Sequence, residues 1–242
     1  MKKIGVVLSG CGVFDGAEIH ESVITLLAID RAGAQAVCIA PNVDQMHVIN
    51  HLTGGEAQGE SRNVLVEAAR IARGEIKDIS TVKADDIDAL VFPGGFGAAK
   101  NLSSFAVNGE NCDVNPEVMR LVKEFAAKQK PQAALCIAPA MMAKIYEGET
   151  AKPVLTIGND KDCGGKIETM GSRHQDCATT DFVIDEENKI VTTPAYMTGQ
   201  SISEVAEGIE KTINKLVSMI CLLYTSDAAD EGLGVDLGGR RI

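Results

Sequence analysis

The stretch Ile4-Gly5-Val6-Val7-Leu8 is an apolar run of the length of one buried strand, and the glycine-rich segment 9–16 follows it directly. Apolar side chains then recur at helical spacing over residues 19–33, and residues 35–39 form a second short apolar run. Two strands connected through a helix are usually parallel neighbours in one sheet. The start of the chain therefore predicts the strand-helix-strand unit of an α/β fold.

The same alternation continues to residue 220. Further strands are predicted at residues 88–92, 131–135, 154–157, 182–185 and 189–192, and further helices at residues 63–73, 116–128, 138–146 and 202–220. No linker interrupts this order, so we predict a single doubly wound α/β domain over residues 1–220. The polar segment 42–61 is too long for an ordinary loop, and we expect it to be an insertion over the functional site.

The last residues, 221–242, have a different character. They show no sustained helical or strand period and end in glycine and arginine. We interpret them as a non-native tail that interrupts the last helix, and we exclude them from the fold.

Composition limits the possible partners. The chain of 242 residues has 34 acidic and 23 basic side chains, which gives a formal charge of -11. A surface of that charge repels phosphate backbones, so we expect no nucleic acid partner. No apolar run reaches the roughly 18 residues that a membrane helix needs, so we expect no membrane partner. A small polar substrate fits this composition better.

Cysteine usage indicates the compartment. Seven cysteines are scattered without a framework spacing, which is typical of a reducing environment. The apolar stretch from Ile4 to Leu8 is shorter than the roughly 7 to 15 residues of a signal-peptide core. We therefore predict a cytoplasmic protein.

Neither a nucleotide cofactor nor a metal is predicted. The first glycine-rich loop does not match the dinucleotide fingerprint, and no acidic residue ends the second strand. Cys163, His174 and Cys177 follow no known zinc spacing.

The segment Ala134-Leu135-Cys136-Ile137-Ala138 carries the strongest chemical signal. A nucleophile elbow holds its reactive residue on a tight strand-to-helix turn and needs small residues two positions to either side, here Ala134 and Ala138. At a helix N-terminus the thiolate form is favoured, which predicts a lowered pKa for Cys136. A small buried cysteine that only fills the core is the alternative.

Two other segments lead to the same edge of the sheet. Pro93-Gly94-Gly95 follows a buried strand, and its N–H groups, with that of Ile137, could stabilise an oxyanion. Glu21 lies on the first helix, off the apolar stripe of Ile19, Val23 and Leu27. A solvated carboxylate that only complements the helix dipole is the alternative for Glu21.

Three segments together, residues 15–23, 92–102 and 134–140, resemble the ThiJ/PfpI superfamily, and residues 1–220 are most similar to its ElbB group of glyoxalases. The resemblance implies a flavodoxin-like three-layer sandwich with a mostly parallel sheet, related to the class I glutamine amidotransferases, and a homodimer. It also implies a cofactor-independent site with Cys136 as nucleophile, Glu21 as its carboxylate partner, and Gly95 and Ile137 as oxyanion donors. An association with isoprenoid biosynthesis is implied as well.

The activity implied is conversion of glyoxal to glycolate, with methylglyoxal to lactate and protein deglycation as related reactions. A redox-sensing or regulatory protein that uses the same cysteine is the alternative. Many members of the superfamily carry a histidine after the strand that follows the elbow helix, but residues 155–159 contain none, which disfavours a protease or amidase. His51 and Tyr196 are further candidates for the substrate pocket.

Overall fold

The structure is a computed structural model that describes the backbone of residues 1–231 and the side chains of residues 1–221. Its central sheet has seven strands in the order β3-β2-β1-β4-β5-β9-β8, all parallel to their neighbours except β8. Their bounds are β1 Lys3–Val7, β2 Gln35–Ala40, β3 Ile76–Asp78, β4 Ala89–Phe92, β5 Gln132–Leu135, β8 Val183–Asp185 and β9 Ile190–Thr193. The predicted α/β class with a mostly parallel sheet is confirmed.

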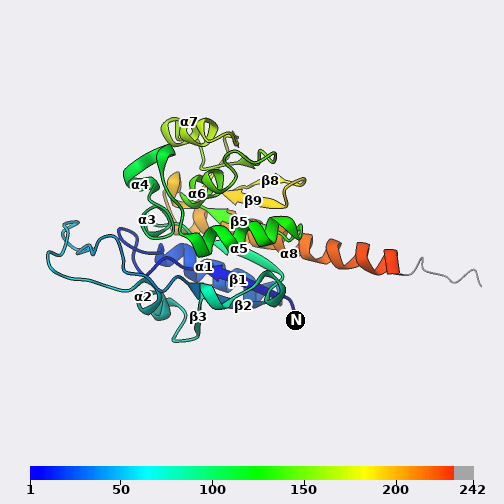
Figure 1. Cartoon of the computed structure of the whole chain (residues 1–242), viewed down its shortest axis with the longest axis horizontal. Helices are drawn as coiled ribbons and strands as arrows, with labels where there is room; N and C mark the ends of the chain where they lie inside the picture. The colour runs from blue at the N-terminus through cyan, green and yellow to red at the C-terminus, as the bar shows by residue number, and fades with distance from the viewer. Residues whose placement is uncertain (232–242) are drawn as a thin grey trace, which may run out of the picture.

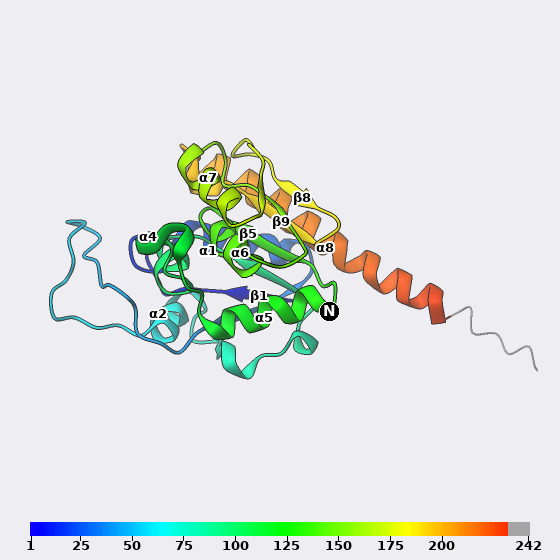
Figure 2. The same ribbon diagram turned by 45° about the horizontal axis from the view of Figure 1, so that its top comes forward.

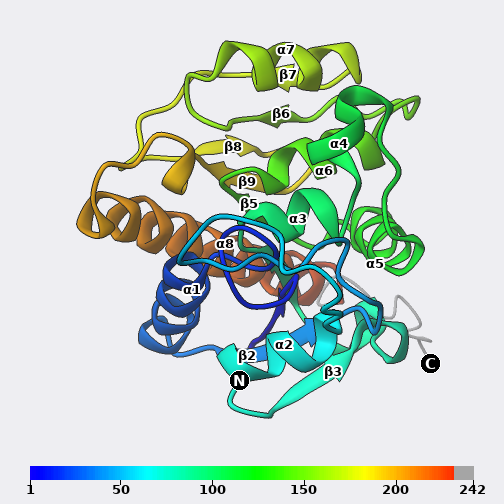
Figure 3. The ribbon, with the colours of Figure 1, turned by 90° about the vertical axis from the view of Figure 1, so that its left-hand side faces the viewer.

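Helices cover both faces of this sheet, which makes three layers (Figure 3). One face carries α1 Ile19–Arg31, α2 Val64–Ile71 and α8 Ile202–Glu231; the other carries α3 Phe96–Lys100, α4 Phe105–Asn108, α5 Pro116–Ala127 and α6 Ala138–Ile145. In β4, Leu90 and Phe92 pack into one core while Ala89 and Val91 pack into the other. Both sides of the strand are therefore apolar, as expected for a parallel strand between two helical layers.

Several short elements were not predicted. They are β3, α3, α4, α7 Lys161–Thr169, β7 Arg173–His174 and four single turns of 3-10 helix, Ile79–Thr81, Ala84–Asp86, Gly109–Asn111 and Ala195–Met197. The predicted strand at residues 154–157 is shorter, since β6 spans only Val154–Leu155, and it pairs with β7 outside the main sheet. Most of these segments contain too few residues for a hydrophobic period to be detected. The nine residues of α7 include two adjacent glycines, Gly164 and Gly165, which disfavour a helix.

The buried face of α1 differs from the one that hydropathy suggests. Ile19, Val23 and Leu27 are 43%, 50% and 43% exposed, whereas Glu21 and Thr25 are fully buried. The small and polar side of this helix faces the protein, since α1 packs against α8 and the N–H groups of Gly94 and Tyr196 donate to Glu21. Tertiary contacts, rather than the apolar stripe, determine the orientation of the helix.

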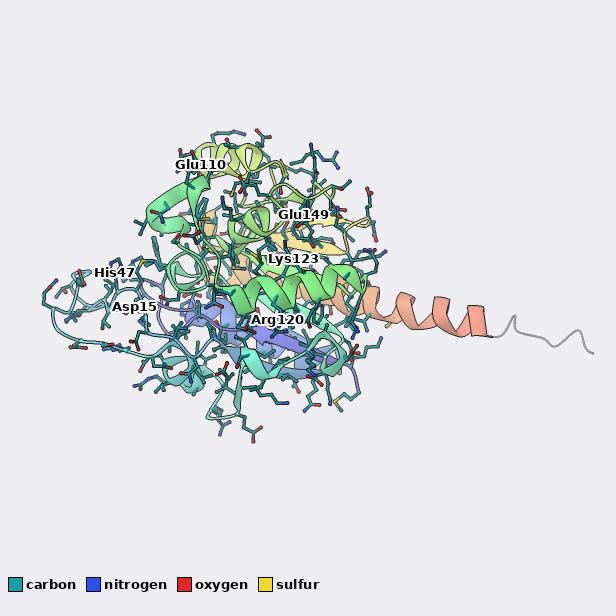
Figure 4. The ribbon with its side chains drawn as sticks, in the orientation of Figure 1. Asp15, His47, Glu110, Arg120, Lys123 and Glu149 are labelled. Carbon is teal, nitrogen blue, oxygen red and sulfur yellow. The ribbon has the colours of Figure 1, made fainter. Side chains whose placement is uncertain are left out.

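The insertion between β2 and α2 extends away from the body of the protein (Figure 2). It leaves from the edge at which the parallel strands end, and Asp15 and His47 both lie on that side of the molecule (Figure 4). The insertion is therefore near the expected edge of the sheet.

The last helix is longer than predicted. α8 continues without a break to Glu231 because neither glycine nor proline occurs in residues 221–231, so the expected interruption after Ile220 is wrong. Residues 232–242 of the predicted tail lie outside the described residues. In the described part of the chain, no helix has the length and apolar character needed to cross a membrane.

We expect truncation after Ile220 to leave the melting temperature and activity unchanged. The far part of α8 projects from the body at the sheet edge opposite the insertion (Figure 1), whereas Met219 and Ile220, the last core residues, are retained. Thermal unfolding of the two lengths of chain tests this expectation, and a shift of several degrees would show that the removed segment packs on the fold.

Candidate active site

Cys136 occupies the turn between β5 and α6. Its φ of +59° lies in the left-handed region, which a residue other than glycine rarely adopts. Its backbone N–H donates to the Thr193 carbonyl on the neighbouring strand at 3.0 Å, and Ala134 and Ala138 are both fully buried. The geometry is that of the predicted elbow, and only 8% of the cysteine surface is exposed.

Glu21 lies beside this cysteine. The carboxyl group is completely buried and forms a hydrogen bond with the Cys136 thiol. One oxygen, Oε2, accepts from the Gly94 N–H at 2.8 Å, and the other accepts from the Tyr196 N–H at 3.2 Å. Three segments that follow β4, β5 and β9 therefore hold this one side chain, which is not the solvated carboxylate of the alternative interpretation.

The helix start fixes where Glu21 projects. Glu18 is the N-cap of α1, and its side chain accepts from the Glu21 N–H at 2.7 Å. The Glu18 N–H in turn donates to the Gly94 carbonyl at 2.9 Å. These bonds join the first turn of α1 to the loop after β4, so the carboxyl group is held at the elbow.

Burial changes the proton affinities of both groups. Burial is the main cause that raises the pKa of Glu21 to about 7. Burial, and next the Glu21 carboxylate, raise the pKa of the Cys136 thiol well above its ordinary value. The lowered thiol pKa predicted from the helix terminus is therefore wrong, because desolvation outweighs the N–H groups. The two groups titrate as a pair.

The predicted oxyanion donors surround the sulfur. The backbone N–H groups of Gly95 and Ile137 both donate to Cys136, and these bonds lower its pKa against the effect of burial. When this sulfur attacks a carbonyl carbon, the oxygen of that carbonyl would lie close to the N–H groups of Gly95 and Ile137. The arrangement can stabilise a negative charge on either the sulfur or that oxygen.

Gly94 leaves no room for a side chain. A Cβ atom there would lie 2.3 Å from the Cβ of Cys136 and 2.8 Å from Oε2 of Glu21. Only glycine lets the loop after β4 approach both reactive groups this closely.

We expect Gly94→Ala to lower the free energy of unfolding by about 1–3 kcal/mol and to reduce turnover, because the added methyl group separates the cysteine from the carboxyl group. Gly165→Ala is the matched control, since a Cβ atom there meets nothing within 4 Å. Denaturant unfolding of both variants checks this, and equal stability of the two would contradict the close packing at Gly94.

A cavity of about 360 Å³ opens beside Cys136. Gly95, Ile137 and Tyr196 line it, as the sequence predicted for Tyr196, whose hydroxyl bonds to Nδ1 of His20 at 2.8 Å. His51 does not line it. Six further residues of the wall were not predicted to line a pocket, because they lie at a helix cap, in short elements or in the glycine-containing α7: Glu18, Phe96, Phe105, Cys163, Lys166 and Met197.

His51 instead anchors the insertion to the first glycine-rich loop. Its Nε2 accepts from the Phe14 N–H at 3.2 Å, its Nδ1 bonds to the Ile49 carbonyl at 3.0 Å, and Asp15 accepts from the Ile49 N–H at 2.7 Å. None of the four histidines lines the cavity within the described residues. In that part of the chain, no group of three or more potential ligands could hold a metal.

The structure is a doubly wound α/β domain with a cysteine at a strand-to-helix elbow and a buried carboxyl group beside it. The chain belongs to the DJ-1/PfpI family, whose model matches residues 11–193. This confirms the resemblance to the ThiJ/PfpI superfamily and the fold related to class I glutamine amidotransferases.

Individual relatives match over most of their length. The chain is 44% identical to the human glutamine amidotransferase-like class 1 domain-containing protein 3, mitochondrial, over 90% of this chain and 83% of that protein. It is 43% identical to the rat ES1 protein homolog, mitochondrial, with coverage of 90% and 84%. A solved isoprenoid biosynthesis protein with an amidotransferase-like domain from Ehrlichia chaffeensis is 39% identical, with a TM-score of 0.82 and coverage of 89% and 99%.

The names of the curated relatives contradict the predicted cytoplasmic location, since both proteins are named as mitochondrial. That prediction is wrong because it depended on unpaired cysteines. Free thiols indicate a reducing environment and do not distinguish the cytosol from other reducing compartments.

Proposed function

We propose that this protein is a cofactor-independent glyoxalase that converts glyoxal to glycolate through Cys136, as in the ElbB group that its sequence resembles. The contact between Cys136 and Glu21 is the observation that carries this proposal, because both side chains are buried and each shifts the pKa of the other. A thiol alone adds to aldehydes. A thiol with a carboxyl group in contact can also move a proton between two adjacent carbons.

The reaction begins with the pair holding one proton. The Glu21 carboxylate takes the proton of the Cys136 thiol as the sulfur adds to one aldehyde carbon. The oxygen of that carbonyl receives hydrogen bonds from Gly95 and Ile137 and then this proton from Glu21. The Glu21 carboxylate next removes the hydrogen of that carbon as a proton, and the electron pair moves toward the second carbonyl. Return of the proton to the second carbon, together with transfer of the hydroxyl proton from the first oxygen to the second, leaves a hydroxy thioester on Cys136.

Water completes the cycle. It attacks the thioester carbon, the bond to sulfur breaks, and glycolate leaves with the Cys136 thiol restored. One glyoxal and one water give one glycolic acid, so no electron acceptor is consumed. The same steps convert methylglyoxal to lactate.

Direct identification of the product tests this proposal. Metal-stripped protein and glyoxal are incubated in heavy water and followed by nuclear magnetic resonance. We expect glycolate with deuterium on its second carbon, because a proton carried by Glu21 exchanges with solvent. Loss of glyoxal without glycolate, or no loss at all, would contradict the proposed activity.

We further propose a homodimer. The exposed stripe of Ile19, Val23 and Leu27 on α1 supports it, because three large apolar side chains on one helix face would be covered in a subunit interface. We expect light scattering to give the mass of a dimer at micromolar concentration, and Val23→Asp to give a monomer. A monomeric mass for the unmodified protein would contradict this proposal.

A further inference from the structure

The cavity beside Cys136 is larger than glyoxal requires. Glyoxal has four non-hydrogen atoms, which occupy at most roughly 120 Å³ if each takes the volume of one water molecule, about 30 Å³. The cavity has about 360 Å³, so most of it would stay unfilled. Sites of this size usually bind larger molecules.

The wall away from the sulfur is mainly apolar. It is formed by Val13, Phe96, Ala99, Phe105, Ala106 and Met197, which come from the first loop, α3, α4 and the turn after β9. Phe105 is 6% exposed and Phe96 is 48% exposed, so the surface runs from the interior toward solvent. Such a wall stabilises hydrocarbon groups and provides few partners for hydroxyl groups.

The charges around the cavity disfavour an acidic substrate. Among the residues that line the cavity, Lys166 carries the positive charge. Its ammonium group already donates a hydrogen bond to Asp162 at 2.6 Å. Glu18 lines the same cavity, and Glu21 lies behind the reactive cysteine. An additional carboxylate on the substrate would meet these acidic groups without an unpaired cation to balance it.

We propose that the substrates of this site are neutral 2-oxoaldehydes that carry an apolar substituent of several carbon atoms. The aldehyde carbon lies at Cys136 and the substituent lies against the wall that includes Phe105 and Ala106. This inference rests on the proposed function. The reaction has the same balance: one oxoaldehyde and one water give one 2-hydroxy acid, and the substituent is unchanged.

A substrate series tests the inference. The panel contains glyoxal, methylglyoxal and oxoaldehydes with straight chains of up to five carbons, together with a five-carbon chain that ends in a carboxylate. We expect kcat/KM to rise about fourfold for each added methylene, which amounts to about sixteenfold over the two methylenes between methylglyoxal and the five-carbon compound. The acid-ended compound should be poorer than its neutral counterpart.

Two neighbouring variants distinguish the cavity wall from the rest of the surface. Ala106 is exposed and lines the cavity, so Ala106→Phe narrows the cavity without disturbing the core. It should lower the ratio of kcat/KM for the five-carbon compound to that for glyoxal by about tenfold. Val107→Phe is the control, since Val107 is 63% exposed and does not line the cavity.

The outcomes separate this inference from the proposed function. Glyoxal turnover that depends on Cys136, with a flat or falling series, or with the acid-ended compound preferred, would overturn the inference and keep the function. An unchanged ratio in Ala106→Phe would overturn the assignment of the wall. Absence of turnover for every compound would overturn both.

Discussion

Cys136→Ala is expected to abolish the conversion of glyoxal while the protein stays folded. The side chain is nearly buried and small, so its replacement by another small residue costs little packing. Among the side chains that the structure describes, however, Cys136 is the thiol that Glu21 and the N–H groups of Gly95 and Ile137 contact, so its removal takes away the proposed nucleophile. Glycolate formation and thermal unfolding of the purified variant check this expectation.

Cys163→Ala is the matched control, because Cys163 lines the same cavity but is not in hydrogen-bond contact with Glu21. It should retain most of the activity. Full activity in Cys136→Ala would show that the nucleophile is a different residue. Loss of activity in both variants would show that the activity does not depend specifically on the cysteine at the elbow.

Glu21→Gln is expected to reduce turnover on the order of a hundredfold or more, the usual contribution of general acid-base catalysis. The amide cannot carry the proton between the two carbons. It also provides one acceptor for the N–H groups of Gly94 and Tyr196, where the carboxyl group provides two. Steady-state kinetics with glyoxal at several pH values check this, and turnover equal to the unmodified protein would contradict the role of Glu21.

Thermal stability gives an independent check on the same variant. Because the folded-state pKa of Glu21 is raised from 4.5 to about 7, ionisation of this group opposes folding. The penalty is absent below pH 4.5, grows as the pH rises to about 7, and is then constant. The stability of Glu21→Gln relative to the unmodified protein should therefore increase between pH 5 and pH 8, and a pH-independent difference would contradict the raised pKa.

Much of the fold could be predicted from the sequence because long, buried elements have a strong pattern. The strands around Val6 and Leu90 are continuous apolar runs, and the helix after Asn115 begins with an asparagine cap that accepts from the Glu117 N–H. The elements that form the outer wall of the cavity could not be predicted in this way. They are one or two turns long, and the N-cap of α3 is Gly95, which has no side chain to form a cap.

The candidate site was predictable for a different reason. Cys136 and Glu21 are far apart in sequence. Cys136 lies just before α6 and Glu21 lies in the first turn of α1, and both helices begin at the carboxyl edge of the parallel sheet, so the topology brings the two residues together. The direction in which α1 faces could not be predicted from hydropathy. Ile19 and Val23 are exposed because the buried position belongs to Glu21.

The pairing of Cys136 with Glu21 is the central claim, and the pH dependence of Cys136 alkylation tests it most directly. Mass spectrometry measures the reaction of this cysteine separately from the other six. We predict that alkylation of the unmodified protein rises only well above pH 7, because burial and the Glu21 carboxylate hold the proton on the sulfur, and that the rise moves to lower pH in Glu21→Leu, where burial acts on the thiol alone. The same profile in both proteins would contradict this pairing.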